Sequence, residues 1–291
     1  MMKRILALLL VLTLVLGGAL LLASCRRDKG DGEGGEGGEG GTPNTPATPT
    51  YTFKLNDAGD AYAISAVNKD TAGALTLPST HEGKPVTEIA AFAFRACTKL
   101  TSVTIPESVT KIGGGAFYDC TALVSVNIPS GVTVIREDTF TSCEALTAIT
   151  LPDSVTEIES NAFSYCTALA SINIPSGVTA IGERAFSGCE SLAEITLPDS
   201  VTEIGNCVFM TCKSLVTARV GAELATIPYA TFLGCKALTT VYLGAGLTTI
   251  GGYAFEECAA LTDVYYSGSE ATWQGVTGTA ELGDVTVHFG A

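Results

Sequence analysis

Residues 100–122 read LTSVTIPESVTKIGGGAFYDCTA, and close variants of this stretch follow one another along most of the chain. Leucine, phenylalanine and cysteine each recur at a constant step of 23 residues through eight successive units. The leucines are Leu100, Leu123, Leu146, Leu169, Leu192, Leu215, Leu238 and Leu261; the phenylalanines are Phe94, Phe117, Phe140, Phe163, Phe186, Phe209, Phe232 and Phe255; the cysteines are Cys97, Cys120, Cys143, Cys166, Cys189, Cys212, Cys235 and Cys258. Three residue types fixed to one period indicate a protein whose units pack on their neighbours.

Each unit offers a short strand, a second extended stretch and a turn. Val103 and Ile105 alternate with polar residues, which is typical of a strand with one buried face. Pro106 ends this strand, because proline cannot donate to a central ladder. Residues 109–112 form the second extended stretch, and the Ala-Phe-x-x-Cys segment at 116–120 is short enough to predict one helical or 3-10 turn. The predicted fold is a mainly β repeat solenoid of about eight 23-residue units with a cap at each end.

The consensus L-x-x-V-x-I-P-x-x-V-x-x-I-x-x-x-A-F-x-x-C resembles the BspA-type leucine-rich repeat of bacterial and some protist surface proteins. The resemblance covers roughly residues 75–265 and involves eight positions in nearly every unit. It implies a leucine-rich-repeat coil and a role in adhesion or in binding proteins of a host or partner cell. It implies no particular site residues.

The first 50 residues predict export and a tether. Lys3 and Arg4 precede an apolar run at 5–22, and Leu22-Ala23-Ser24-Cys25 resembles a bacterial lipobox. We therefore expect a lipoprotein signal peptide at 1–24 and a diacylglycerol group on Cys25; a permanent transmembrane helix is the alternative. Residues 25–50 hold the lipidated cysteine and a Gly/Glu and then Thr/Pro linker that we expect to be disordered. Both alternatives place the rest of the chain outside the cytoplasm, on the cell membrane or cell surface.

The remaining residues divide around the regular repeats. Residues 51–99 are expected to form an N-terminal cap with an irregular first repeat, and residues 100–260 seven regular repeats. Residues 261–291 form a partial repeat and a cap. We expect that cap to close on Trp273 with three apolar partners, which are Val285, Val287 and Phe289.

The charge and the histidines argue against several functions. The 30 acidic and 16 basic residues give a formal charge of −14, which disfavours nucleic acid and anionic lipid surfaces. His81 and His288 are the two histidines, one in each cap, so no Ser/His or Cys/His pair is expected. The sequence has no C-x-x-C pair and no histidine near the repeated cysteines, so no tetrahedral metal site is predicted. We expect no enzyme, no cofactor and no metal site, a monomer, and membrane contact only through Cys25.

The repeated phenylalanines and cysteines are predicted to lie in the core. Stacked cysteines would have Cβ atoms about 4.8 Å apart, beyond the roughly 3.5–4.5 Å of a disulfide. We therefore expect free buried thiols that act as small apolar groups. Cys207 occupies a position held in other units by unlike residues, such as Gly115 and Arg184. It is therefore expected to be the accessible thiol of the domain.

A ligand site is expected on the outward positions of the first strand. Along the stack, the position between the two inward side chains is Thr or Asn in five coils and then Arg219, Tyr242 and Tyr265. Tyr and Arg are favoured at binding hot spots, so these three are the candidate ligand-binding residues. The alternative is that tyrosines merely suit exposed strands. The ligand could be protein or glycan.

A second regularity has a period of 46 residues. Units that carry an acid, at Asp153 and Asp199 with a near copy at Glu107, alternate with units that read NIPSGVT. A duplicated pair of units explains this alternation without any function.

The sequence therefore predicts a surface-anchored recognition or adhesion module that binds a protein or glycan of a host or neighbouring cell. The first alternative is a scaffold lipoprotein that binds its own cell envelope. The third hypothesis, an enzyme, would need a pocket with convergent titratable groups.

Overall fold

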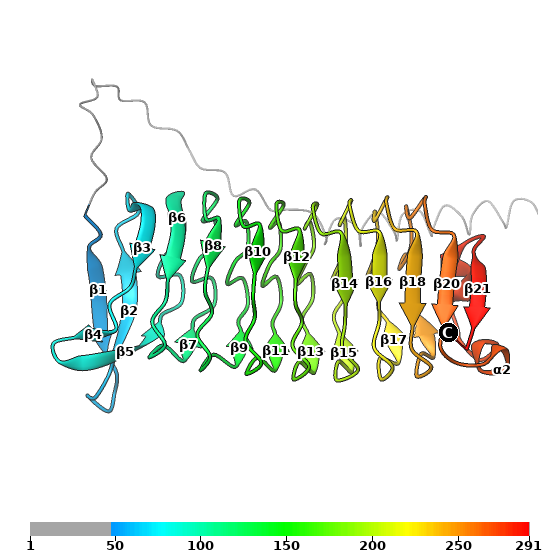
Figure 1. Ribbon diagram of the computed structural model, residues 1–291, viewed down its shortest axis with the longest axis horizontal. Helices are drawn as coiled ribbons and strands as arrows, with labels where there is room; N and C mark the ends of the chain where they lie inside the picture. Colours follow the sequence, from blue (N-terminus) through cyan, green and yellow to red (C-terminus); the bar gives the residue numbers. More distant parts are fainter. Residues whose placement is uncertain (1–47, 291) are drawn as a thin grey trace, which may run out of the picture. The chain divides into compact units, whose positions relative to one another are not determined.

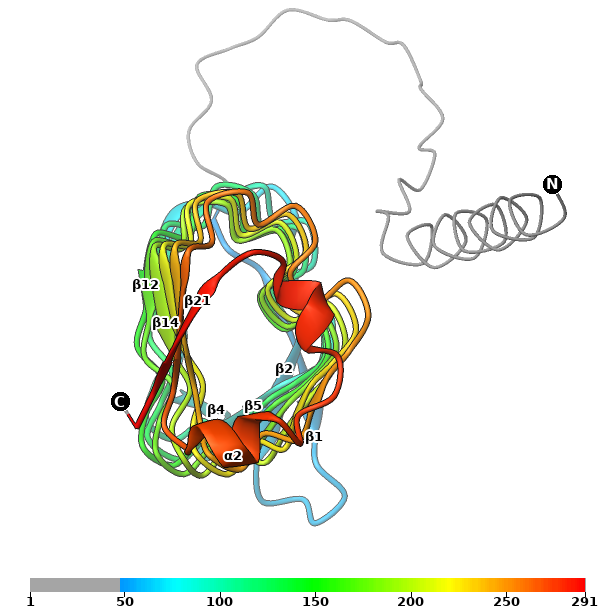
Figure 2. The same ribbon diagram turned by 90° about the vertical axis from the view of Figure 1, so that its right-hand side faces the viewer.

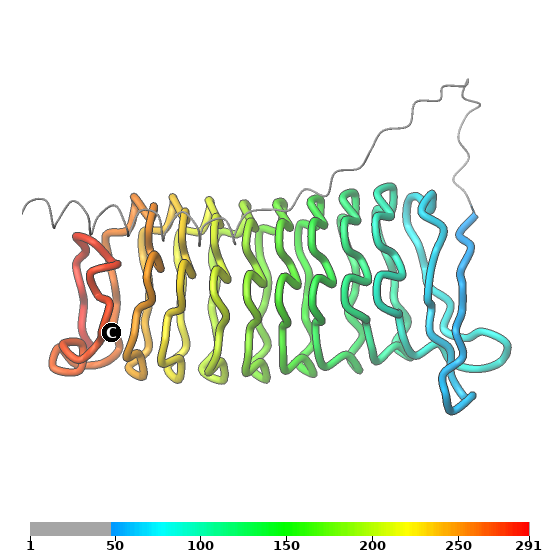
Figure 3. Tube along the Cα trace, turned by 180° about the vertical axis from the view of Figure 1, so that it is seen from behind, coloured from blue at the N-terminus to red at the C-terminus, as the bar shows by residue number. Residues whose placement is uncertain are grey.

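The computed structural model describes residues 48–290. The predicted signal peptide, the predicted lipidation site Cys25 and most of the linker lie outside these residues. The described chain forms a β-solenoid of about ten turns of roughly 23 residues with almost no helix. Figure 1 shows the coils stacked side by side, and Figure 3 shows the same stack from behind. The predicted repeat solenoid is confirmed.

Two rows of parallel strands run along the solenoid on different sides of the coil, as the view along the axis shows (Figure 2). The first row consists of β3 (Ala72–Thr76), β6 (Lys99–Thr104), β8 (Ser125–Val126), β10 (Ala148–Ile149), β12 (Ser171–Ile172), β14 (Glu194–Thr196), β16 (Thr217–Arg219), β18 (Thr240–Leu243), β20 (Asp263–Tyr266) and β21 (Thr286–Phe289). The second row consists of β5 (Lys84–Ile89), β7 (Lys111–Ile112), β9 (Val134–Ile135), β11 (Glu157–Ile158), β13 (Ala180–Ile181), β15 (Glu203–Ile204), β17 (Thr226–Ile227) and β19 (Thr249–Ile250). Paired residues are one repeat apart, as in Ala218 with Val241, so equivalent side chains form columns.

The Ala-Phe-x-x-Cys segments form consecutive turns. The Ala116 N–H donates to the Gly113 carbonyl at 3.1 Å, which is a 3-10 type bond, but the next N–H, of Phe117, donates to Thr139 of the following coil at 2.9 Å. Successive backbone N–H groups of the turn therefore donate in alternation within their own coil and to the following coil. This geometry needs left-handed backbone at two positions per turn, for example Gly115 (φ 62°) and Asp119 (φ 60°). The 3-10 hydrogen bonds were expected, but they do not build a helix.

The phenylalanines form the spine of the core. All eight are at most 4% exposed, and each ring stacks on the next with centroids 5.1–5.6 Å apart. Because coils repeat at about the spacing of paired strands, one ring per coil continues the stack along the interior. The predicted phenylalanine core is confirmed.

Both ends of the stack are covered by irregular structure. At the N-terminal end β1 (Tyr51–Leu55) and β2 (Tyr62–Val67) pair antiparallel, and the short β4 (Thr80–His81) pairs with β5. At the other end lie the helix α2 (Glu270–Trp273) and the 3-10 helix η1 (Thr279–Leu282). Trp273 packs on Tyr266 and Phe289, with ring centroids 5.0 and 6.5 Å away. Over residues 48–290, no helix has the length and apolar character needed to cross a membrane.

In parts of the first strand row, asparagine side chains take the place of backbone hydrogen bonds between neighbouring coils. In a regular coil the N–H of Leu197 donates to the carbonyl of Arg219 in the next coil at 2.8 Å. At the equivalent place the N–H of Ile105 donates to Oδ1 of Asn127 at 2.7 Å, and Nδ2 of Asn127 donates to the Ile105 carbonyl at 2.8 Å. Asn173 holds the backbone of the coil before it in the same way. These asparagines belong to the NIPSGVT units of the 46-residue alternation.

The alternation therefore groups the coils in pairs. Within the described residues the first row divides into β3-β6-β8, β10-β12 and β14-β16-β18-β20-β21. An asparagine clamps β6 to β8 and β10 to β12, and a seam without strand pairing follows each clamped pair. The duplication thus has a structural consequence that its sequence did not predict.

The clamp can be tested with Asn173→Ala. This change leaves the N–H and carbonyl of Leu151 without their side-chain partner, and we expect the free energy of unfolding to fall by about 1–2 kcal/mol. Thr196→Ala is the control, because Thr196 holds the same position in a coil with regular pairing, and it should cost under about 0.5 kcal/mol. Urea denaturation measures both, and equal losses would contradict the clamp.

Candidate ligand-binding surface

The structure brings the three predicted site residues into one column. Arg219, Tyr242 and Tyr265 are register partners on β16, β18 and β20. The guanidinium carbon of Arg219 lies 3.6 Å from the centroid of the Tyr242 ring, a cation–π contact. The rings of Tyr242 and Tyr265 stack with centroids 4.9 Å apart and an interplanar angle of 14°.

His288 extends this column by one strand. It pairs with Tyr265 across β20 and β21, and the two rings stack with centroids 4.4 Å apart. Its Nε2 lies 2.8 Å from Oδ1 of Asp263, and hydrogen bonds from His288 and Thr262 hold the pKa of that carboxyl below its usual value. We call the column Arg219, Tyr242, Tyr265 and His288 the aromatic ridge.

The stacking decides which parts of the ridge a ligand can reach. The strand of Tyr242 lies between those of Arg219 and Tyr265, so both faces of its ring are covered. The ring of Tyr265 is covered by Tyr242 and His288 in the same way. Solvent therefore meets ring edges and polar ends. A sugar that stacks on an aromatic needs an open ring face, whereas ring edges and hydroxyls suit the mixed contacts of a protein interface.

A small pocket of about 270 Å³ opens beside the ridge, where the strands end. Its lining residues come from four successive coils. The pocket is lined by Asp199, Val220, Ala222, Tyr242, Leu243, Gly244, Tyr265 and Ser267. Asp199 is the charged residue of this lining, and its Oδ1 accepts a hydrogen bond from the N–H of Ala222 at 2.8 Å. The acid of the 46-residue alternation thus has a local structural role at this position.

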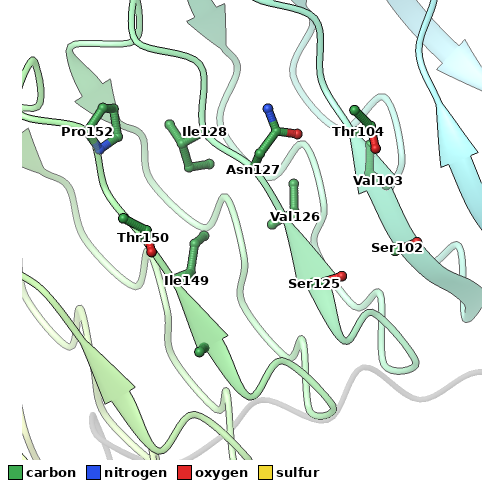
Figure 4. Close-up of a pocket in the computed structure, with 11 residues that line it drawn as sticks. Ser102, Val103, Thr104, Ser125, Val126, Asn127, Ile128, Ile149, Thr150 and Pro152 are labelled. Carbon is green, nitrogen blue, oxygen red and sulfur yellow. The ribbon is translucent and has the colours of Figure 1, made fainter.

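A larger groove lies nearer the N-terminal end of the same row (Figure 4). It has a volume of about 610 Å³ and spans the seam between β8 and β10. Its wall and floor are formed by Ser102, Val103, Thr104, Ser125, Val126, Asn127, Ile128, Ala148, Ile149, Thr150 and Pro152. These side chains are uncharged. Asn127 is already bonded to the neighbouring backbone, so the groove offers the hydroxyls of Ser and Thr but no charged side chain.

The cysteine ladder consists of free, mostly buried thiols, as predicted. From Cys120 to Cys258, each ladder Sγ donates to the carbonyl of a phenylalanine in the preceding coil, as Cys120 does to Phe94 at 3.0 Å. Burial raises the pKa of Cys120 to about 12 and that of Cys166 well above its ordinary value. Neutral thiols with high pKa values are poor nucleophiles and poor metal ligands. Among residues 48–290 no group of three or more His, Cys, Asp and Glu side chains is arranged to hold a metal ion.

The prediction for Cys207 is wrong, because its side chain is 1% exposed. The residue lies in the turn row, where neighbouring coils approach closely, and its N–H donates to the Tyr229 carbonyl at 3.0 Å. A side chain as short as cysteine stays below the surface there, whereas Arg184 at the same position is long enough to reach solvent. Variability at a repeat position did not indicate exposure.

Comparison with known proteins gives a family and a fold. The model of the BspA-type leucine-rich-repeat region, in six copies, matches residues 74–178 and 156–274. A leucine-rich-repeat protein of T. pallidum is 30% identical, with a TM-score of 0.53, over 86% of this chain and all of that one. The pneumococcal vaccine antigen PcpA is 22% identical, with a TM-score of 0.53, over 74% of this chain and 67% of that one; it supports the fold alone. No curated protein matches the sequence.

Proposed function

Since the chain belongs to the BspA-type leucine-rich-repeat family, we propose that it is a cell-surface module, anchored by lipid on Cys25, that recognises a protein through the aromatic ridge. The observation that carries this proposal is the ridge itself. Four large side chains stand in one column at the C-terminal end of the first strand row. They follow coils whose outward positions are Thr and Asn.

The ridge has the properties of a protein-binding hot spot. Tyr and Arg are enriched at such sites because they give large contact area and directed hydrogen bonds. The stack and the His288–Asp263 bond hold the side chains in place before any ligand arrives, so binding orders few rotamers. The covered ring faces favour a protein over a stacked sugar.

The surface location rests on the sequence and on the family. A lipobox-like Leu-Ala-Ser-Cys spans the predicted cleavage site before Cys25. A tether through Cys25 would leave the solenoid facing outward, where a partner on a host or neighbouring cell can reach the ridge. A leucine-rich-repeat solenoid is typically an interaction scaffold.

The test is a binding screen of the mature lipoprotein in detergent against arrayed matrix proteins, glycans and cell-wall fragments. We expect a protein hit whose affinity falls at least about tenfold in the Arg219→Ala/Tyr242→Ala/Tyr265→Ala variant. Thr104→Ala/Thr150→Ala/Thr196→Ala is the matched control, because it changes the same outward position in earlier coils.

The other outcomes point elsewhere. A glycan hit that the ridge variant loses would overturn the argument from covered ring faces. Binding only to the producer's own envelope, unchanged in the ridge variant, would support a scaffold and remove the ridge from the function.

A further inference from the structure

We propose that the pocket beside the ridge, formed by Asp199, Val220, Leu243, Tyr242 and Tyr265, receives a lysine or arginine side chain of the partner protein. This inference rests on the proposed function and names the chemistry of the residue that the partner presents. The pocket volume of about 270 Å³ suits one long side chain.

The coils around the pocket differ from the earlier ones in the residue that follows the strand. In five earlier coils a proline stands there: Pro106, Pro129, Pro152, Pro175 and Pro198. The following coils have Gly221, Gly244 and Ser267 instead. A Cβ on Gly244 would lie 2.4 Å from the Cα of Ala222 in the preceding coil. The two coils are therefore in contact there, and glycine is the residue that fits. Gly244 and Ser267 line the pocket together with Tyr242 and Tyr265.

The lining matches a basic side chain in both polarity and charge. Val220 and Leu243 offer apolar surface for the methylene groups of lysine or arginine, which pack well while their charged ends stay polar. Asp199 supplies the carboxylate. One of its oxygens is oriented by the Ala222 N–H, which leaves the other for a charge-assisted hydrogen bond. The edges of Tyr242 and Tyr265 complete the wall.

The charge of the whole domain favours the same partner. Residues 1–47 contain five acids and five bases, so the formal charge of −14 falls entirely on residues 48–291. Lys236 is the last basic residue apart from His288, and six acids follow it. Arg219 precedes Val220 of the pocket lining. Its guanidinium lies over the Tyr242 ring, 3.6 Å from the centroid. An acidic end of this kind attracts basic surfaces and repels acidic ones.

The chain contains a matched control position. Asp153 precedes Asp199 by two repeats and occupies the same place in the coil. Its coil and the following one keep their prolines, Pro152 and Pro175, and no tyrosine stands on the neighbouring strands there. If the pocket recognises a base, Asp199 should matter and Asp153 should not.

The experiment is ligand-observed saturation-transfer NMR on the mature lipoprotein in detergent. The probes are Nα-acetyl-lysine amide, Nα-acetyl-arginine amide and, as the uncharged control, Nα-acetyl-glutamine amide. We expect saturation of the side-chain methylenes of the two basic probes and little for glutamine. Asp199→Asn should weaken the basic probes about fivefold, because it removes the charge and keeps an acceptor for Ala222. Asp153→Asn should leave them unchanged.

The failures of the two proposals are distinguishable. If the basic probes do not bind, bind no better than glutamine, or bind equally to Asp199→Asn, the pocket assignment is wrong. The ridge would still stand if its triple-alanine variant loses the partner found in the screen. Saturation could also appear only after Arg26, Arg27 and Lys29 are replaced by alanine. That result would mean that this chain's own basic segment occupies the pocket, and it would also overturn the proposal.

Discussion

Phe163→Ala is expected to lower the free energy of unfolding by about 3–5 kcal/mol, the usual cost of removing a fully buried phenylalanine. Phe163 is 0% exposed and stacks between Phe140 and Phe186, with centroids 5.4 Å away on each side. Neighbouring coils are held at a fixed distance by backbone hydrogen bonds, so they cannot close the hole. Urea denaturation followed by circular dichroism measures the loss.

Two controls make this prediction specific. Val216→Ala changes a side chain that is 44% exposed and should cost under about 0.5 kcal/mol. Phe255→Ala should cost less than Phe163→Ala, because Phe255 has one ring neighbour in the ladder, Phe232. A midpoint for Phe163→Ala that equals the wild-type midpoint would mean that the ring contributes no packing energy.

The repeat made most of the fold predictable. In a solenoid each coil contacts its neighbours, so one period in the sequence sets both the strand register and the columns of side chains. The Phe column and the strand at Val103 and Ile105 could therefore be assigned from spacing alone. The hydrogen-bond pattern of the turn segment could not be predicted in this way. At Ala116 and Phe117 the successive N–H groups bond within the coil and to the next coil, and no local pattern in one unit shows that division.

The site was predictable where it follows the period. Arg219, Tyr242 and Tyr265 were found from the 23-residue step and the outward direction of the side chain. His288 was missed although it is 23 residues after Tyr265, because the leucine and phenylalanine of the motif are lost in the cap. Applying the step past the last motif would have found it.

Other features depend on how closely the coils approach one another. The pocket beside the ridge is lined by residues of successive coils, and at Gly244 the preceding coil lies too close for a Cβ. The burial of Cys207 follows from the same closeness in the turn row. The clamp at Asn127 uses a side chain where other coils use backbone. Each of these features depends on the distance between neighbouring coils, and the residue types within one unit do not determine that distance.

Alkylation of Cys258 at about pH 8 is expected to run on the order of a thousandfold slower in the folded protein than in the unfolded chain, because the thiolate is the reacting species. Burial, with a smaller contribution from the nearby Cys235, raises the pKa of Cys258 from 9.0 to about 12. Cys258 is the sharpest case among the ladder cysteines. It is only partly buried, so slow reaction there reflects its protonation as well as restricted access.

The pH dependence separates these two causes. Since the folded pKa is raised, the thiolate fraction of Cys258 should grow about tenfold per pH unit up to roughly pH 12, whereas the unfolded chain should level off above about pH 9. The folded and unfolded rates should therefore converge as the pH rises. Peptide-level mass spectrometry of iodoacetamide labelling, with the chain unfolded in guanidinium chloride as reference, measures both rates. Cys207 should also react slowly, because its side chain is buried. Rapid labelling of Cys258 at about pH 8, or disulfides joining ladder cysteines in the native protein, would contradict a column of neutral thiols bonded to phenylalanine carbonyls.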